Sequence, residues 1–307
     1  MRNVVIVDSV RTGLAKSFRG TLNMTRGDDM VAHCIDALLE RNSNLPADAV
    51  EDIIMGCGNP EGPTGHNIGR NAVVLSKLPI TTSGTTVNRY CSSGLQTISM
   101  AAGQIMAGGY DTILAGGVET FSDVPIRYSK PMRQWLIDFP KQSKKGPLKT
   151  LQYMSQLTPK HFIPEPPALA NYTTGELMGA TSEKIAQRFD VSRFDQDQFT
   201  IRSHNLAYLA HQEKLYQNEI FSVDGNTMED NIRPNLTLEK LTKLKPSFKK
   251  GGTHTPGNST GLTDGASACL LASDDKVKEL GINSLGTIMD SVFVGTDPYQ
   301  EMLLGPA

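Results

Sequence analysis

The stretch from residue 80 to residue 96 reads ITTSGTTVNRYCSSGLQ. Its first half, up to Val87, is rich in β-branched residues, which is typical of a strand. From Leu95 onward, apolar residues recur at helical spacing at positions 98, 102 and 105, which predicts a helix. A strand that leads directly into a helix is a building unit of α/β sheets, so this stretch indicates the fold class of the chain.

The same alternation extends on both sides of this stretch. Apolar runs predict strands at residues 3–8, 51–55 and 111–115, and helices are predicted to begin at Asp28 and to span residues 68–75. The strand at 111–115 is apolar throughout its interior, as expected for a strand covered on both faces. The pattern therefore predicts a mostly parallel sheet with helices on both sides.

Farther along, the chain carries three further structural signals. The segment from Pro159 to Pro167 contains four prolines and is predicted to be an extended loop. Ser192 and Asp195 resemble a capping box, and the helix that they open is expected to run to about residue 216. The apolar run Leu285–Val294 predicts another strand.

Cys91 is the candidate catalytic residue, because it lies at the predicted strand-to-helix turn. Unpaired backbone N–H groups and the positive end of the helix dipole favour a thiolate at this place. The neighbours Ser92, Ser93 and Gly94 are small, so a substrate can approach the sulfur closely. These features predict a cysteine nucleophile. The alternative is a small buried hydrophobe, the usual role of a cysteine in an intracellular protein.

Three motifs, which occur in the family's order, resemble those of the thiolase family. They are NRYCSSG at residues 88–94, AGGVETFS at residues 115–122 and GNSTGLTDGA at residues 257–266. The resemblance runs from Asn3 to Ala307. It implies a thiolase-like α/β fold, in which a mixed, mostly parallel sheet carries helices on both faces, plus an inserted, mainly helical loop domain.

The resemblance also implies how the chain divides. Residues 1–122 and 250–272 are expected to form the N-terminal thiolase domain. Residues 123–249 are expected to form the loop domain, which contains a basic helical hairpin and a segment that binds coenzyme A. Residues 273–307 are expected to begin a C-terminal thiolase domain that is incomplete.

Composition and charge exclude several classes of protein. The 307 residues carry a formal net charge of −2, so no global positive field attracts the chain to nucleic acid. The hydrophobic share of 38% is ordinary for a soluble protein, and no run approaches the roughly 18 apolar residues of a membrane span. Because the chain opens on the strand pattern at Val4 without a targeting segment, we expect a bacterial cytoplasmic protein, with a processed mitochondrial protein as the alternative.

The remaining cysteines and the loops indicate no metal and no separate cofactor. Cys34, Cys57 and Cys269 have no C-x-x-C spacing, which argues against zinc and dithiol redox chemistry. Cys34 and Cys269 lie in apolar patterns and are expected in the core, whereas the role of Cys57 is open. No Walker-type loop or G-x-G-x-x-G is present, so coenzyme A is expected as a substrate and no nucleotide cofactor is expected.

A basic segment follows residue 123. It combines seven lysines and arginines up to Lys149 with apolar residues such as Trp135 and Phe139. Such a segment is usually a solvated face, but it can also be an amphipathic helical pair that lies on an anionic membrane. The segment resembles the hairpin in β subunits of the fatty-acid trifunctional enzymes. That resemblance implies peripheral membrane contact and an α subunit with hydratase and dehydrogenase activities, and family behaviour implies a homodimer.

The resemblance assigns four further site residues. Arg233 and Thr260 are expected to contact coenzyme A, and Met178 is expected to form a wall of the pantetheine tunnel. Leu177 stands where short-chain members often have a histidine, so medium or long acyl chains are expected. A pure packing role for Leu177 and Met178 remains the alternative, since a methionine at a helix start is more often a core residue.

The resemblance implies a 3-ketoacyl-CoA thiolase (acetyl-CoA acyltransferase) of fatty-acid β-oxidation that works through an acyl-cysteine at Cys91. In the family, the base histidine and the acid cysteine belong to C-terminal motifs of the Asn/His-Glu-Ala-Phe, Gly-His-Pro and Cys-x-Gly-Gly types. None of these motifs occurs in this sequence. We therefore expect a truncated chain that exposes apolar surface and has little activity alone.

Three alternatives stay open at this point. One is a biosynthetic acetoacetyl-CoA thiolase, and another is a non-catalytic thiolase-like partner subunit. The third is a ketoacyl synthase, which shares the architecture but consumes a malonyl thioester instead of free coenzyme A. The motif around Cys91 and the segment around Arg233 argue against the third alternative.

Overall fold

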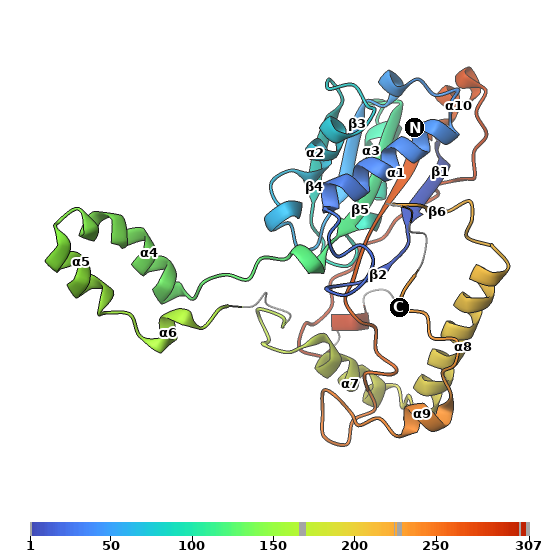
Figure 1. Ribbon diagram of the computed structural model, residues 1–307. Helices are drawn as coiled ribbons and strands as arrows, with labels where there is room; N and C mark the ends of the chain where they lie inside the picture. The colour runs from blue at the N-terminus through green and yellow to red at the C-terminus, as the bar shows by residue number, and fades with distance from the viewer. Residues whose placement is uncertain (1, 166–169, 224, 226–228, 301, 305–307) are drawn as a thin grey trace.

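A sheet of eight strands forms the body of the part of the chain that the structure describes (Figure 1). The computed structural model describes residues 2–165, 170–223, 225, 229–300 and 302–304. The strands are β1 (Val4–Thr12), β2 (Ala15–Lys16), β3 (Asp52–Gly56), β4 (Ser83–Val87), β5 (Thr112–Glu119), β6 (Ile220–Phe221), β7 (Thr263–Ser273) and β8 (Gly286–Thr287). Their order is β4-β3-β5-β7-β1-β6, and β2 and β8 pair with β7 and β1.

Helices connect the strands, and two groups of helices, within residues 130–162 and 178–242, lie away from the sheet (Figure 1). The α-helices are α1 (Gly27–Arg41), α2 (Ile68–Leu75), α3 (Ser93–Met106), α4 (Lys130–Ser143), α5 (Pro147–Met154), α6 (Pro159–Phe162), α7 (Met178–Arg188), α8 (Arg193–Gln212), α9 (Leu238–Thr242) and α10 (Asp274–Leu280). The predicted helix at residues 68–75 is confirmed, as is the helix that opens beside Asp28.

The expected mixed sheet with helices on both faces is confirmed, but its strands are less uniformly parallel than expected. β3 runs parallel to β4 and to β5. β7, which is 11 residues long, runs antiparallel to both of its neighbours, β5 and β1. An apolar run shows that a strand is covered on both faces but says nothing about its direction. The apolar pattern around Cys269 therefore predicted its burial correctly and could not predict an antiparallel strand.

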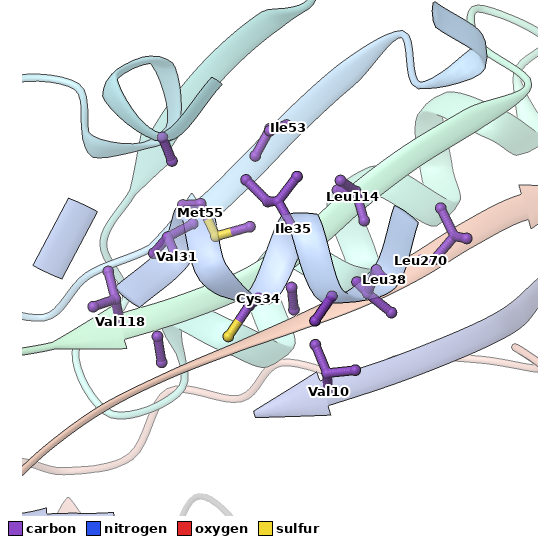
Figure 2. Close-up of a cluster of buried hydrophobic side chains, with 14 of the residues drawn as sticks. Val10, Val31, Cys34, Ile35, Leu38, Ile53, Met55, Leu114, Val118 and Leu270 are labelled. Carbon is purple, nitrogen blue, oxygen red and sulfur yellow. The ribbon is translucent and has the colours of Figure 1, made fainter. Parts of the chain in front are cut away.

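The core consists of two clusters, one on each face of the sheet. On one face, α1 and α2 pack against alternate side chains of the central strands, and Figure 2 shows Ile35 and Leu38 of α1 facing this surface. On the other face, Ala101 and Ile105 of α3 pack against Ile54. Neighbouring residues of β3 thus point to opposite clusters, as the two-residue period of a strand requires. This arrangement fixes α3, and with it the turn that precedes α3, against the sheet.

Three local predictions are wrong. The segment Leu285–Val294 forms only the short strand β8, which pairs with Val5 and Ile6 of β1. The backbone N–H groups of Leu285 and Ile288 also donate to Ile6 and Val4 of β1. Residues 289–294 have no partner strand among the described residues, and an apolar run without a partner cannot satisfy the backbone groups of a strand. α8 ends at Gln212, about one turn earlier than expected.

The third wrong prediction concerns the prolines. Pro159 begins the short helix α6 instead of an extended loop. Proline is favoured at the first position of a helix, where its missing N–H would have no partner, and Thr158 and His161 form the capping box that holds this turn. Pro166 and Pro167 lie outside the described residues, so the extended conformation expected for them stays a prediction.

Helices α4, α5 and α6 form an arm that extends away from the sheet (Figure 1). Trp135 of α4 stacks on Phe139 and on Tyr153 of α5, with ring centroids 4.8 and 5.3 Å away. At the base of the arm, Arg127 and Glu165 exchange backbone hydrogen bonds of 3.2 and 2.8 Å. None of the described helices has both the length and the apolar character that crossing a bilayer requires. The domain limits at residues 122, 249 and 272 stay a prediction.

Candidate active site

Cys91 lies where the sequence predicted it, between the end of β4 at Val87 and the start of α3 at Ser93. It is exposed, whereas Cys34, Cys57 and Cys269 are buried. Burial raises the pKa of Cys34 to about 12 and the pKa values of Cys57 and Cys269 to about 11. These three side chains are therefore protonated thiols at neutral pH. Cys91 is therefore the one exposed cysteine of the described chain.

The turn that carries Cys91 comprises residues 88–92 and is called the cysteine turn below. Asn88 braces it, because its Oδ1 accepts a hydrogen bond from the Tyr90 N–H at 2.7 Å. Ser93 braces it from the helix side, since its hydroxyl accepts from the Arg89 N–H at 2.8 Å and donates to the Tyr90 carbonyl at 2.6 Å. Asn88 and Ser93 thus have a structural reason to accompany the cysteine in the motif.

Two glycines let this region pack and leave space beside it. A Cβ on Gly56 would lie 2.7 Å from backbone and side-chain atoms of Ser93, so glycine lets the first turn of α3 approach β3 closely. A Cβ on Gly94 would meet no atom within 4 Å. The space next to Gly94, three residues after Cys91, is therefore open in the described chain.

Glu119 ends β5 and lies beneath the loop that leads from β3. Its carboxylate accepts hydrogen bonds from the Gly58 N–H at 2.9 Å and from the Asn59 N–H at 3.2 Å. Burial raises the pKa of Glu119, and the hydrogen bonds from these two residues oppose that increase. The sequence motif contains Glu119, but the sequence alone gave this residue no role.

Asp264 joins three segments that are distant in the sequence. Its fully buried carboxylate accepts a hydrogen bond from the Ser17 hydroxyl at 2.7 Å and from the Ser122 N–H at 3.2 Å, and the Ser122 hydroxyl bonds to its second oxygen. Ser122 belongs to the AGGVETFS motif and Asp264 to the GNSTGLTDGA motif. The order of the motifs is the signal that could have indicated this contact.

The structure places the four predicted coenzyme A contacts on the surface of the described chain, three of them in residues 123–249 and Thr260 just before β7. Leu177 caps the N-terminus of α7 and Met178 is its first residue, and they are 45% and 41% exposed. Arg233 is exposed, and its backbone N–H donates to Nδ1 of His204 at 3.1 Å. Thr260 is exposed in the segment that precedes β7. The partial exposure of Leu177 and Met178 is compatible with a ligand contact, and their predicted roles stay predictions.

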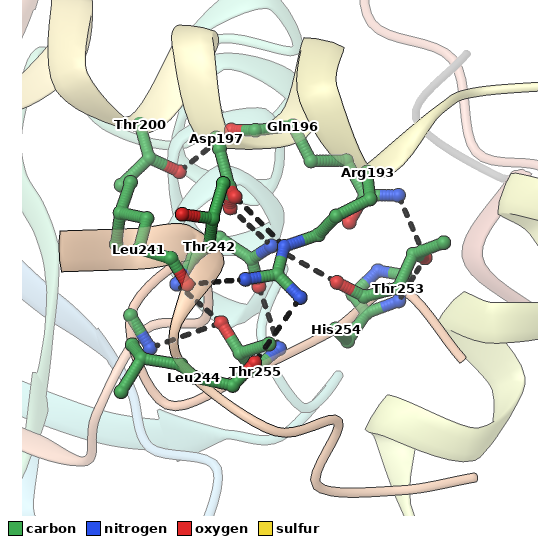
Figure 3. A network of polar contacts seen from close by, with 12 residues as sticks. Arg193, Gln196, Asp197, Thr200, Leu241, Thr242, Leu244, Thr253, His254 and Thr255 are labelled. Atoms are coloured by element: carbon green, nitrogen blue, oxygen red, sulfur yellow. Dashed lines mark hydrogen bonds and ion pairs between the residues drawn. The ribbon is translucent and has the colours of Figure 1, made fainter. Parts of the chain in front are cut away.

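A polar network fixes the segment that leads to Thr260, as Figure 3 shows around Arg193 and Asp197. Asp197 of α8 is completely buried, and its carboxylate accepts from Arg193 Nε at 2.8 Å and from Asn258 Nδ2 at 2.9 Å. Arg193 also donates to the carbonyl of Leu241 in α9 at 2.5 Å. The network thus ties α8, α9 and residues 253–258 together.

Glu183 of α7 holds the same segment from the other side. It accepts hydrogen bonds from the backbone N–H groups of Thr253 and His254, both at 2.9 Å. Burial opposes ionisation of Glu183, but these bonds outweigh it and hold the pKa of the carboxyl group below its usual value. Glu183 and Asp197 were not predicted from the sequence, because acidic residues in helices are usually solvated.

A cavity of about 340 Å³ lies beside α3, among β1, β5 and β7. Gly94, Ile98, Arg11 and Cys269 contribute to its lining, but none of the five predicted site residues does. Within the described residues, no group of three or more His, Cys, Asp or Glu side chains could hold a metal ion. The described site presents the exposed thiol of Cys91 and the polar groups of the cysteine turn.

Comparisons with known proteins agree with this geometry. The family model of the thiolase N-terminal domain matches residues 4–275. The mitochondrial trifunctional enzyme subunit beta of Homo sapiens is 37% identical over 311 residues, which cover 100% of this chain and 64% of that protein. The 3-ketoacyl-CoA thiolase of Bacillus subtilis (strain 168) is 35% identical over 323 residues, which cover 100% of this chain and 74% of that protein.

Among solved structures, the Bacillus anthracis acetyl-CoA acetyltransferase is similar to this chain, with a TM-score of 0.82 and 28% sequence identity. The match covers 97% of this chain and 72% of that one. The chain spans 64% of the length of the trifunctional subunits that it matches.

Proposed function

Since the chain belongs to the thiolase family, we propose that the whole protein is a degradative 3-ketoacyl-CoA thiolase, an acyltransferase of fatty-acid metabolism. The observation that carries this proposal is the exposed Cys91 at the braced turn before α3. Named 3-ketoacyl-CoA thiolases from Bacillus subtilis and Psychrobacter cryohalolentis are each 35% identical to this chain and support the reaction class.

The proposed reaction has two steps. The Cys91 thiolate attacks the 3-keto carbon, the bond between C2 and C3 breaks, and its electron pair leaves with C2, which takes up a proton to give acetyl-CoA. The thiol of free coenzyme A then loses its proton and attacks the acyl-cysteine. The bond between the acyl carbon and Sγ breaks, and a shortened acyl-CoA and the Cys91 thiolate are released.

We assign the proposed substrate contacts to exposed residues near α7 and in the segments around residues 233 and 260. Arg233 supplies a positive charge for a phosphate of coenzyme A, and Thr260 supplies a hydroxyl for hydrogen bonding. Leu177 and Met178 present partly exposed apolar surface to the pantetheine arm and the acyl chain. Coenzyme A is a substrate in this proposal, and no separate cofactor is required.

Product analysis and an acyl-enzyme trap test the proposal together. The whole protein is purified and incubated with 3-ketohexadecanoyl-CoA and free coenzyme A, and the products are separated by chromatography. We expect acetyl-CoA and tetradecanoyl-CoA in equal amounts, and a tetradecanoyl group on Cys91 in peptide mass spectra when free coenzyme A is omitted. Absence of both the products and the acyl-cysteine would contradict the proposal and favour a non-catalytic thiolase-like subunit.

A biosynthetic acetoacetyl-CoA thiolase is the second candidate. The high TM-score with an acetyl-CoA acetyltransferase is the observation that favours it. Acetoacetyl-CoA and 3-ketohexadecanoyl-CoA distinguish the two candidates when they are compared as substrates at equal concentration. A preference for acetoacetyl-CoA, together with condensation of two acetyl-CoA molecules, would support the second candidate.

We also propose a homodimer that acts in a bacterial cytoplasm together with an α subunit carrying hydratase and dehydrogenase activities. The similarity to trifunctional enzyme subunits beta supports the α subunit, and the bacterial relatives support the compartment. Because the trifunctional relatives are mitochondrial by name, processing in a mitochondrion is the alternative.

The arm is the proposed site of peripheral membrane contact. Ile137, Leu148 and Leu151 are 65%, 85% and 67% exposed, which is unusual for large apolar side chains in helices that have an aromatic core between them. Four exposed lysines accompany them, at positions 141, 144, 145 and 149. An apolar surface next to lysines has the chemistry of a segment that binds anionic lipid.

Liposome co-sedimentation tests this contact. Each basic residue near an anionic surface contributes about 1 kcal/mol, so replacing the four arm lysines with glutamine should reduce binding to vesicles of phosphatidylglycerol and phosphatidylcholine at least about tenfold. The matched control replaces the four exposed lysines at positions 243, 245, 249 and 250, and it should leave binding unchanged. Equal binding of the unmodified protein to pure phosphatidylcholine vesicles would sink the idea.

A further inference from the structure

Glu119 is surrounded by hydrogen-bond donors from one loop. Its carboxylate accepts from the Gly58 N–H at 2.9 Å and from the Asn59 N–H at 3.2 and 3.3 Å, and the Cys57 Sγ lies 3.9 Å away. All of these partners are donors, which favours the ionised carboxylate. Glu119 therefore holds the loop of residues 57–59 by several charge-assisted bonds, the stronger class of protein hydrogen bond.

The same loop contacts the cysteine turn on its other side. The Gly58 carbonyl accepts a hydrogen bond from Asn88 Nδ2 at 2.9 Å. The other atom of that amide, Oδ1, accepts from the Tyr90 N–H at 2.7 Å. The backbone of Tyr90 leads directly to Cys91, so the loop and the turn share one set of hydrogen bonds.

One peptide unit connects the two sides. The Asn59 N–H and the Gly58 carbonyl belong to the same planar peptide group, and in a trans peptide they point in opposite directions. The N–H points to Glu119 and the carbonyl points to Asn88. A negative acceptor at one end of a peptide polarises it and strengthens the hydrogen bond that its carbonyl accepts.

Close packing makes this connection rigid. A Cβ on Gly58 would lie 2.7 Å from Glu119 Oε2 and 3.7 Å from the carbonyl of Tyr90. Gly58 thus packs closely against the carboxylate, and an added Cβ would also reach ordinary contact with the turn. Tyr90 itself has a φ of +48°, a conformation that costs energy for a bulky side chain and that persists only where neighbouring contacts enforce it.

We propose that Glu119 is a positioning residue for Cys91, acting through the peptide between Gly58 and Asn59 and through the side chain of Asn88. The inference rests on the proposed function only in that Cys91 is the nucleophile. Glu119 is not assigned as the base that activates the thiol, because its oxygens are already engaged by N–H groups of the loop. Its role is to keep the turn in the one conformation that presents the sulfur beside the N-terminus of α3.

Alkylation of Cys91 by iodoacetamide at pH 7, followed by peptide mass spectrometry, tests this inference. The variant Glu119→Gln keeps the size of the side chain but places an NH₂ group against a backbone N–H. We expect alkylation about tenfold slower than in the unmodified protein, the effect of losing one hydrogen bond to a charged group. An unchanged or faster rate would overturn the inference.

Glu51 provides the matched control. Its carboxylate also accepts two backbone N–H groups, those of Asp111 and Thr112, but at the opposite end of β5. Glu51→Gln should lower the midpoint of urea unfolding without changing the alkylation rate. If Glu51→Gln slowed alkylation as much as Glu119→Gln, the effect would be general destabilisation and the inference would fail.

A double variant tests the connection itself. If Glu119 acts through Asn88, then Glu119→Gln combined with Asn88→Ala should alkylate no more slowly than Asn88→Ala alone. Multiplying effects would show independent action and would contradict the proposed route. Alkylation does not require acyl transfer, so failure of the thiolase assay in the unmodified protein is distinguishable from failure of this inference.

Discussion

Cys91→Ala is expected to abolish acyl transfer, with a loss of at least about 10³-fold in the rate of product formation from 3-ketohexadecanoyl-CoA and coenzyme A. The reason is that alanine has no atom that can form the covalent bond to the 3-keto carbon. The other thiols do not replace it, since Cys57 and Cys269 are buried and their pKa values are raised to about 11. The measurement is product formation at saturating substrate, together with acyl-cysteine in the peptide that contains residue 91.

Cys269→Ala is the control for this prediction. It removes a sulfur of the same type from the buried side of β7, where the side chain is 9% exposed and belongs to the core cluster of α3. We expect it to lower the stability but to leave the rate of the folded protein within about threefold, because Cys269 packs in a core cluster and takes no part in the proposed reaction. Product formation by Cys91→Ala at the unmodified rate would remove Cys91 from the mechanism.

The parts of the fold that local patterns determine could be predicted from the sequence. Hydrophobic periods of 3.6 and 2 residues predict the helix at residues 68–75 and the strands around Ile54 and Ile113. The change from one period to the other predicts the turn at Cys91. Ser192 caps α8 as its sequence indicated, and its hydroxyl accepts from the Asp195 N–H at 3.1 Å. Each of these features depends on residues close to one another in the sequence.

The features that could not be predicted depend on residues far apart in the sequence. The direction of β7 is set by its pairing with β1 and β5, which an apolar run does not encode. The role of Glu119 depends on a loop 60 residues earlier, and Asp197 binds Asn258, 61 residues later. The segment after Leu285 has the composition of a strand, but it forms a strand only at the two residues that pair with β1.

Asp197→Ala is expected to produce the largest loss of stability among single substitutions in residues 123–249, the predicted loop domain. Asp197 is 0% exposed, and its removal takes the charged partner from the Arg193 guanidinium in the network of Figure 3, which keeps only carbonyl acceptors. It also removes one of the two acceptors of the Asn258 amide. Breaking a buried ion pair on one side costs about 3–5 kcal/mol, and because Arg193 is 23% exposed we expect the lower end of this range, about 3 kcal/mol. Urea unfolding followed by circular dichroism measures the change.

Glu239→Ala is the matched control, because Glu239 and Lys243 form an ion pair at the same helical spacing of four residues. Their side chains are 80% and 71% exposed, so solvent screens the pair and its loss should change the free energy of unfolding by at most about 0.5 kcal/mol. Both pairs join opposite charges at the same spacing, so the difference between the two changes in the free energy of unfolding measures the contribution of burial. Equal, small effects would mean that the segment containing Asn258 is held by other contacts, such as those from Glu183. A large effect of Asp197→Ala alone would identify the α8 carboxylate as the anchor of the segment that presents Thr260.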